Sequence, residues 1–548
     1  MRGVALRRAG VGVICLAVAS GLACAFLGTL PRVAGIDILR AALVFASGAW
    51  LAWGCALALL GLGWSPPAPP RGAPAGRTAI LMPICNEDAA ATAARIGAVR
   101  ASLEASGHAH LFEFAVLSDS RPEVASEERR RLEALLALAP GAPLHYRRRA
   151  DRRGRKAGNI AEFLRTAGGR FRYAVVLDAD SLVEGDTLVE MVRRMEGDPG
   201  LGLLQTVPLV LGARTRFGRV MQFASHLTGP LQARGLAALQ GREGPYWGHN
   251  AIFRVAPFAA HCGLAPLPGT PPLGGDILSH DYVEGALLAR AGWRVRLDPD
   301  LAGSFEETPQ DLVEHARRDR RWCQGNIQHG RLIGLDGLAG WSRLSFFLNL
   351  CAYAMAPVWA LFLLASLLRP LATGTEPHAA FPTGFEGLVF AVICLLVLPR
   401  LAALAHELAR PGHAPRARLL AGALAELAFS ALLAPILLAY QIRAVLEVLR
   451  GRDAGWPASD RDGRPLTLAE AWEATGWVTT LGLAGLALTV AAALGSLYFV
   501  LPVFLPMLFA PVLAAWSSRG SAAGGLPGAG TERGVPDVAR LRDDLLSA

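Results

Sequence analysis

The sequence predicts a membrane protein in which one α/β domain is inserted between two groups of apolar helices. Two observations lead to this fold class. Long uncharged runs lie near the N-terminus and again beyond residue 340, whereas residues 77–340 are polar and alternate strand-like with helix-like stretches. The average is correspondingly apolar, because 52% of the 548 residues are hydrophobic and the mean hydropathy is +0.34.

The N-terminal region, residues 1–76, contains two predicted transmembrane helices. Residues 11–30 carry no charge over twenty positions, and residues 43–64 carry none over twenty-two. Either run is long enough to cross a hydrocarbon core of roughly 30 Å. The basic start MRGVALRR is also typical of a cleaved signal peptide, but the length of the first run and the closeness of the second favour an uncleaved anchor.

The C-terminal region, residues 341–516, is predicted to contain about four transmembrane helices and one interfacial helix. The predicted spans are 346–368, 387–398 (extendable to about 405) and two within 477–516.

Residues 419–447 are ambiguous, because their apolar run includes Glu426 and a proline. They could form a span, a broken helix or a helix lying at the interface. Arginines set the orientation, since loop 370–386 has none and 399–418 has four. We expect six spans, with 419–447 interfacial and the loop 448–475 in the cytoplasm; a seventh span would place that loop outside.

The cysteines, the net charge and the C-terminal residues give further information on the class of protein. The eight cysteines form no CxxC pair or zinc-type spacing, which favours small apolar side chains in a reducing compartment. The net charge of +9 fits a membrane surface and anionic small substrates, and no motif predicts a nucleic-acid partner. Residues 517–548 are rich in Gly, Ser and Ala and are predicted to form a flexible cytoplasmic tail.

Polar side chains follow each predicted strand of the segment 77–340. The strands 78–84, 112–120 and 171–180 alternate with helical patterns, which predicts a mostly parallel sheet covered by helices on both faces. Ligands bind such sheets beyond the carboxyl ends of the strands. The residues expected at that edge are Asn86, Glu87, Asp119, Asp178 and Asp180.

Asp178 and Asp180 form a DxD pattern after an apolar strand. In an extended chain, residues two apart face the same side, so both carboxylates could bind one Mg²⁺ or Mn²⁺ together with substrate phosphate. Alone, the pattern is equally typical of a turn or a helix cap.

Lys156 is the only lysine in the chain, within RRRADRRGRKAGN. A compact ammonium beside a diphosphate would explain its retention, and chance is the alternative. We interpret most of the neighbouring arginines as a solvated loop. Asp281, in SHDYVEG, is either a functional carboxylate or a charge favoured by a helix N-terminus. Trp322, in RRDRRWCQGN, is either functional or an interfacial tryptophan.

Taken in order, PICNED, LSDS, KAGN, DAD, SHD and RRW resemble the motifs of the processive family 2 glycosyltransferases, which include cellulose, chitin and hyaluronan synthases. The stretches ILSHDYVEGALLARAGW, YWGHNAIFR and RDRRWCQGN most resemble the branch that makes osmoregulated periplasmic glucans in Gram-negative bacteria. The likeness runs from about residue 77 to 516.

This resemblance implies a cytoplasmic GT-A (Rossmann-like) domain that transfers glucose from UDP-glucose, with inversion, to a growing β-glucan. Asp281 is then the general base, and Asp178 and Asp180 hold Mg²⁺ or Mn²⁺. The implied nucleotide-sugar residues are Asn86, Glu87, Asp119, Lys156, Asp178, Asp180 and Arg321. The implied acceptor residues are Gly248, His249 and Trp322, and the implied gating loop contains Trp456 and Arg461.

Three departures from the family pattern are present. Arg318 stands where the family's QxxRW motif has Gln, the base motif reads SHD where cellulose synthases have TED, and Ser459 stands where Gln is expected in the gating loop. The first two also occur in the glucan branch, whereas the third weakens the assignment of the gating loop.

The resemblance further implies a multi-pass protein of the bacterial inner membrane that moves its product across the bilayer. Acyl carrier protein and periplasmic glucan-processing proteins are implied partners. Two alternatives stay open: a synthase of another β-linked polymer, such as a cellulose-like or N-acetylhexosamine chain, and a membrane scaffold or transport protein that binds a nucleotide without turnover.

Overall fold

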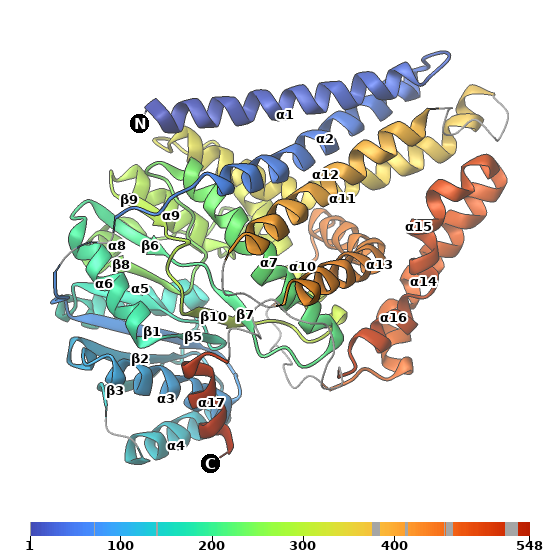
Figure 1. Cartoon of the computed structure of the whole chain (residues 1–548). Coiled ribbons are helices and arrows are strands. Elements are labelled where there is room, and N and C mark those ends of the chain that lie inside the picture. Colours follow the sequence, from blue (N-terminus) through green and yellow to red (C-terminus); the bar gives the residue numbers. More distant parts are fainter. Residues whose placement is uncertain are drawn as a thin grey trace.

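The computed structural model describes residues 2–68, 70, 72–138, 141–374, 384–410, 415–453, 455, 464–520 and 535–547. The α/β domain lies at one end of the molecule, and the long apolar helices extend away from it (Figure 1). This arrangement matches the predicted fold class.

The centre of the α/β domain is a seven-stranded sheet with the order β3-β2-β1-β4-β8-β6-β9. All neighbouring strands are parallel except β8, which is antiparallel to both β4 and β6. The strands are β1 (Thr78–Ile84), β2 (Phe112–Ser118), β3 (Leu144–Arg148), β4 (Tyr173–Val176), β6 (Leu201–Gln205), β8 (Ala251–Arg254) and β9 (Arg294–Leu297).

Alternating residues of β1 explain why helices cover both faces of the sheet. Ile80 and Met82 face one core, and Ala79 and Leu81 face the other. The first core is covered by α3 (Ala89–Ala105), α4 (Pro122–Leu138) and α6 (Gly185–Gly197). The second is covered by α5 (Arg155–Ala167), α8 (Val255–His261) and α9 (His280–Arg290).

A small second sheet adjoins the carboxyl edge of β4. It has the order β5-β10-β7, formed by β5 (Ser181–Val183), β10 (Ser304–Glu307) and β7 (Leu209–Leu211). Two further helices, α7 (Arg216–Gln240) and α10 (Leu312–Gln328), follow β7 and β10 respectively. Short 3₁₀ turns are η1 (Ala109–Leu111), η2 (Gly168–Arg170), η3 (His329–Arg331) and η5 (Leu494–Ser496).

Six described helices are long and apolar enough to cross a membrane. They are α1 (Arg2–Gly28), α2 (Gly35–Leu62), α11 (Gly340–Thr373), α12 (Phe385–Leu408), α13 (Arg416–Leu449) and α14 (Leu468–Ala492). A seventh apolar unit is a pair bent by 60°, made by α15 (Leu497–Leu508), with η5 before it, and α16 (Ala510–Ser517). The predicted two spans within 477–516 are therefore one straight helix and one bent pair.

Two groups of charged residues inside the apolar helices are paired with one another. Glu426 of α13 accepts hydrogen bonds from Arg400 of α12 at 3.0 and 3.1 Å. Asp37 of α2 likewise accepts from Arg40 at 2.7 Å and from Arg369 of α11 at 2.9 Å, with all three residues buried. The charge of Glu426 is thus paired, and α13 is one continuous helix of 34 residues, so the interfacial position of residues 419–447 stays a prediction.

The helix α7 joins the α/β domain to the membrane helices by close contact with α2. A Cβ added at Gly61 of α2 would lie 2.1 Å from the Leu231 carbonyl oxygen, and one at Gly235 of α7 would lie 1.9 Å from the Leu57 carbonyl oxygen. Only glycine permits such an approach of two backbones.

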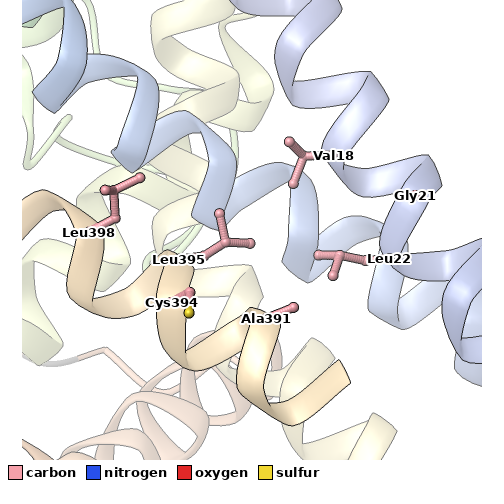
Figure 2. Close-up of a pocket in the computed structure, with 7 residues that line it drawn as sticks. All are labelled: Val18, Gly21, Leu22, Ala391, Cys394, Leu395 and Leu398. Carbon is pink, nitrogen blue, oxygen red and sulfur yellow. The ribbon is translucent and has the colours of Figure 1, made fainter. Parts of the chain in front are cut away.

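An apolar hollow of about 390 Å³ lies between α1 and α12 (Figure 2). Its lining includes Val18 and Leu22 of α1 and Cys394 and Leu395 of α12. All of its lining residues come from these two helices, so the hollow is separate from the polar edge of the α/β domain.

The prediction of a flexible tail is wrong for residues 535–547. They include the helix α17 (Asp537–Ser547), which packs on α3 at the C-terminal end of the chain (Figure 1). Val538 and Ala539 are buried in the first core, and Arg542 pairs with Glu307 of β10 at 2.8 Å. The apolar positions recur at helical spacing, a pattern that is masked by the Gly- and Ser-rich residues before it.

Candidate active site

The predicted polar residues do meet at the carboxyl edge of β1, β2 and β4. The amide of Asp119 donates to the carbonyl of Ile84 at 2.8 Å, which places the ends of β1 and β2 together. Asn86 adopts a left-handed backbone conformation, with φ of 60°. Its amide donates to Ser120 Oγ at 2.6 Å, and its Oδ1 accepts from the amide of Arg121 at 3.0 Å. Asn86 and its neighbour Glu87 therefore lie beside Asp119 at this edge of the sheet.

Asp119 forms a buried, bidentate ion pair with Arg149. The two distances are 2.5 Å from Nε to Oδ1 and 2.8 Å from Nη2 to Oδ2. Asn159 Nδ2 donates to the same carboxylate at 2.9 Å. Arg149 also donates to the carbonyls of Arg153 and Arg155, at 3.0 and 2.6 Å, so it fixes the loop that leads to Lys156. Arg149, which is only 9% exposed, is therefore an exception to the solvated loop expected for most of these arginines.

Lys156 donates a hydrogen bond from Nζ to Asp178 Oδ1. This contact joins the start of α5 to the DxD motif and places the only lysine among the acidic residues of the site. Asp178 and Asp180 lie in a turn between β4 and β5, not in extended chain as predicted. The amide of Ser181 donates to the carbonyl of Asp178 at 2.9 Å, and Ser181 Oγ accepts from the amide of Asp178 at 3.0 Å. The turn, rather than strand alternation, positions the two carboxylates.

Glu306 of β10 lies close to both of these aspartates. It pairs in register with Ser181, the residue after the DxD motif. Burial raises the pKa of Glu306, His249 and Arg318 oppose the rise, and the negative charges of Asp180 and Asp178 add to it. This part of the site thus contains three carboxylates and three basic side chains. The carboxylates are Asp178, Asp180 and Glu306, and the basic side chains are Lys156, His249 and Arg318.

Asp281 lies in the first turn of α9, facing the loop that contains Gly248. A Cβ added at Gly248, whose φ is 82°, would lie 3.3 Å from Asp281 Oδ2. Desolvation raises the pKa of the Asp281 carboxyl; the positive charges of His280 and Lys156 reduce this rise, and Glu284 adds to it. A carboxylate with a raised pKa is a better proton acceptor, as the predicted general base requires.

The segment before Asp281 is held by α10. His329 lies 3.0 Å from the carbonyl of Ser279, and the amide of Leu278 donates to Gln328 Oε1 at 3.0 Å. A Cβ added at Gly325 would lie 2.2 Å from Ser279 Oγ, so the helix and this segment are in close contact. The position of Asp281 therefore depends on the same helix that contains Trp322.

Trp322 is 47% exposed, a large value for a tryptophan. The guanidinium carbon of Arg318, one helical turn earlier, lies 4.4 Å from the centre of its ring. Arg321 lies between them in the sequence, half-buried on α10. The exposed indole is available to a planar or sugar ligand at the edge of the site.

The predicted gating residues Trp456 and Arg461 lie outside the described residues. The chain just before them is attached to α10. Gln324 Nε2 donates to Asp453 Oδ1 at 2.7 Å, and Arg320 Nη2 donates to the carbonyl of Arg452 at 2.6 Å. Residues 452 and 453 thus lie against α10, the helix that contains Trp322.

Sequence reasoning missed two residues of this site. Arg149 is one of many arginines in its stretch, and only the fold reveals which of them pairs with Asp119. Glu306 is part of SFEE, where nothing in the sequence distinguishes it from an exposed strand residue. Arg318 was noted as a departure from the family pattern, but its contact with Trp322 was not expected.

Comparisons with known proteins identify the family of this chain. The model of Glycosyl transferase family 2 matches residues 79–261, and that of Glycosyl transferase family group 2 matches residues 173–404. A solved mannosyltransferase from Pyrobaculum calidifontis, in complex with GDP-Man and Mn²⁺, has 19% identity and a TM-score of 0.48, covering 76% of this chain and 99% of that one. The fold and the site define a family 2 glycosyltransferase with membrane helices.

Curated relatives narrow the class. Glucans biosynthesis glucosyltransferase H of Cereibacter sphaeroides is 48% identical over 93% of this chain and 89% of its own length. Proteins of the same name from Rhodopseudomonas palustris and Caulobacter vibrioides are 42% and 40% identical over 81% and 74% of this chain. This chain spans only 64% and 65% of those two relatives. The chain belongs to the glucans biosynthesis glucosyltransferase H family.

Proposed function

We propose that this enzyme transfers glucose from UDP-glucose to the growing end of a β-glucan, the backbone of an osmoregulated periplasmic glucan, and passes the product across the membrane between its own helices. The observation that carries the proposal is the position of Asp281. Its carboxyl has a raised pKa and lies within the electrostatic reach of Lys156, which contacts the DxD motif. This arrangement supports a proton acceptor and a diphosphate site at one edge of the sheet.

The donor is expected to bind along the carboxyl ends of β1, β2 and β4. Asn86, Glu87 and Asp119 border the uridine, and Lys156 and Arg321 offset charge on the diphosphate. Because both oxygens of Asp119 already accept hydrogen bonds from the protein, we expect this residue to act on the nucleotide mainly by holding the pocket wall.

Asp178 and Asp180 would hold Mg²⁺ or Mn²⁺. No group of three His, Cys, Asp or Glu side chains in the described part of the chain is arranged to bind a metal alone. Two carboxylates fit an ion that completes its shell with phosphate oxygens and water. Such an ion would stabilise the charge that develops on the diphosphate leaving group.

On the acceptor side, Asp281 removes the proton from the attacking hydroxyl while the bond between the anomeric carbon and the diphosphate oxygen breaks. One in-line displacement converts an α-linked donor into a β-linked product. Trp322 supports the acceptor ring, and Gly248 and His249 line its path beside the base.

We further propose that the α/β domain lies in the cytoplasm and that the helices cross the bacterial inner membrane. The arginine-rich loop 399–418 and the basic N-terminus support this orientation. Loop 448–475, with Trp456 and Arg461, would then face the donor and cover it. Acyl carrier protein and periplasmic glucan-processing proteins remain proposed partners.

The test is sugar transfer in membranes that contain the full chain. Radiolabelled UDP-glucose and UDP-N-acetylglucosamine are compared, with Mg²⁺ or EDTA, for the wild-type chain, Asp281→Asn and the exposed control Asp336→Asn. We expect metal-dependent β-linked polymer from UDP-glucose, lost in Asp281→Asn and kept in Asp336→Asn. Polymer from the other donor only would assign the alternative β-linked product, and saturable UDP binding without transfer would favour the scaffold alternative.

A further inference from the structure

We propose that Glu306 and Arg318 form a positioning pair that orients the acceptor-binding surface, so that the acceptor sugar stacks on one defined face of Trp322. The inference rests on the proposed polymerase function and adds to it the residues that determine how firmly the growing chain is held. It starts from Arg318, which replaces the glutamine of the family's QxxRW motif.

Arg318 contacts both Trp322 and Glu306. Its guanidinium lies over the indole at 4.4 Å from the ring centre, and its Nη2 lies 3.7 Å from Glu306 Oε2. A planar guanidinium stacks on an aromatic ring and still donates at its edge, which a glutamine amide does much less well. One face of the indole is therefore occupied by protein, and the acceptor ring is directed to the opposite face.

Glu306 connects this surface to the second acceptor element. Its Oε2 also lies 3.5 Å from Nε2 of His249, in the loop whose Gly248 lies against Asp281. One carboxylate thus contacts both the tryptophan-bearing helix and the loop beside the base. Because β10 pairs with the strand that follows the DxD motif, the carboxylate has a fixed position relative to the donor end of the site.

The neighbouring residue Glu307 shows what a purely structural pair looks like on the same strand. Its side chain pairs with Arg95 of α3 and Arg542 of α17, at 2.7 and 2.8 Å, away from Trp322 and His249. Those partners hold two helices together and contact neither acceptor element. Glu307 is therefore a matched control for Glu306, with the same chemistry and the same strand but the opposite side.

The experiment compares Arg318→Gln, Arg318→Lys, Glu306→Gln, the double variant and Glu307→Gln in full-length protein. Three quantities are measured: the KM for the nucleotide sugar, UDP affinity, and the length distribution of the polymer. We expect Arg318→Gln and Glu306→Gln to shorten the product by roughly fivefold, the scale of one cation–π contact, with the donor KM and UDP affinity unchanged within about twofold. Arg318→Lys keeps the positive charge but loses the planar stack, so it should retain only part of the wild-type length.

The two residues should act as one unit, so the double variant should lose no more than the worse single variant. Glu307→Gln should leave product length unchanged. Wild-type length in Arg318→Gln, or equal losses in donor KM and product length, would overturn the proposal while the polymerase function stands. Product length is measured with whichever donor the wild-type chain uses. A wild-type chain that makes no polymer from either donor would overturn both this proposal and the polymerase function.

Discussion

Replacing Arg149 with methionine should destabilise the α/β domain and loosen the loop that carries Lys156. Arg149→Met keeps much of the side-chain volume but leaves the Asp119 carboxylate buried without its cation. Both side chains are less than 10% exposed, at 7% and 8%, so the pair cannot be discounted as solvent-screened. Removing one partner of a buried ion pair typically costs about 3–5 kcal/mol.

The loss of other hydrogen bonds should destabilise the Arg149→Met variant further. The variant also gives up the hydrogen bonds to the carbonyls of Arg153 and Arg155, which fix the chain immediately before α5. At roughly 2–4 °C per kcal/mol for a domain of this size, the apparent Tm should fall on the order of 10 °C. UDP affinity should fall as well, because the loop leads directly to Lys156.

The assay is thermal unfolding of detergent-solubilised protein with and without UDP, next to Arg152→Met. Arg152 lies in the same loop and is exposed, so its removal should cost at most about 1 kcal/mol. Equal shifts of Tm in the two variants, or no shift in Arg149→Met, would refute the assignment of the buried pair as the feature that holds this loop.

Four other outcomes follow from the same geometry. Val538→Asp should release α17 from α3, because it places a charge at a fully buried position, and limited proteolysis should then cut the C-terminal segment first. The acid limb of the pH profile of kcat/KM should lie above the ordinary aspartate range, because Asp281 must be deprotonated and its folded-state pKa is raised; an acid limb at an ordinary aspartate pKa would contradict this. Gly248→Ala should lower kcat at least roughly tenfold with UDP affinity unchanged, since the new methyl meets Asp281 at a backbone φ of 82°; parallel losses of both would indicate misfolding instead. Lys156→Arg should weaken UDP-glucose binding and slow transfer, and an enzyme with unchanged KM and kcat would remove the functional reason for the single lysine.

Much of the fold and site could be predicted because it depends on local patterns. The strand carrying Ile80 and Met82 is apolar on both faces, as a buried parallel strand must be, and the polar residue that ends it is adjacent in the sequence. The ends of β1 and β2 then meet by a general rule of parallel sheets, which brings Asn86 beside Asp119 without any knowledge of the rest.

The parts that could not be predicted depend on partners far away in the sequence. From the sequence, Glu426 is an unpaired charge in an apolar helix. In the structure Arg400 pairs with it, which lowers the cost of burying it. Glu306 and Glu307 are identical in type and adjacent, yet one contacts Arg318 and the other contacts Arg542, because successive strand residues face opposite sides. Only the assembled sheet shows which of these two sides faces the site.

The packing of α17 on α3 has a consequence for the order of folding during synthesis. Helix α3 emerges among the first parts of the α/β domain, whereas α17 follows all of the apolar helices. The patch of α3 around Gly97, which Leu545 covers in the finished molecule, therefore stays uncovered while the membrane helices are being inserted. A newly made α/β domain would thus present this apolar surface to chaperones until α17 has been synthesised and docks on α3.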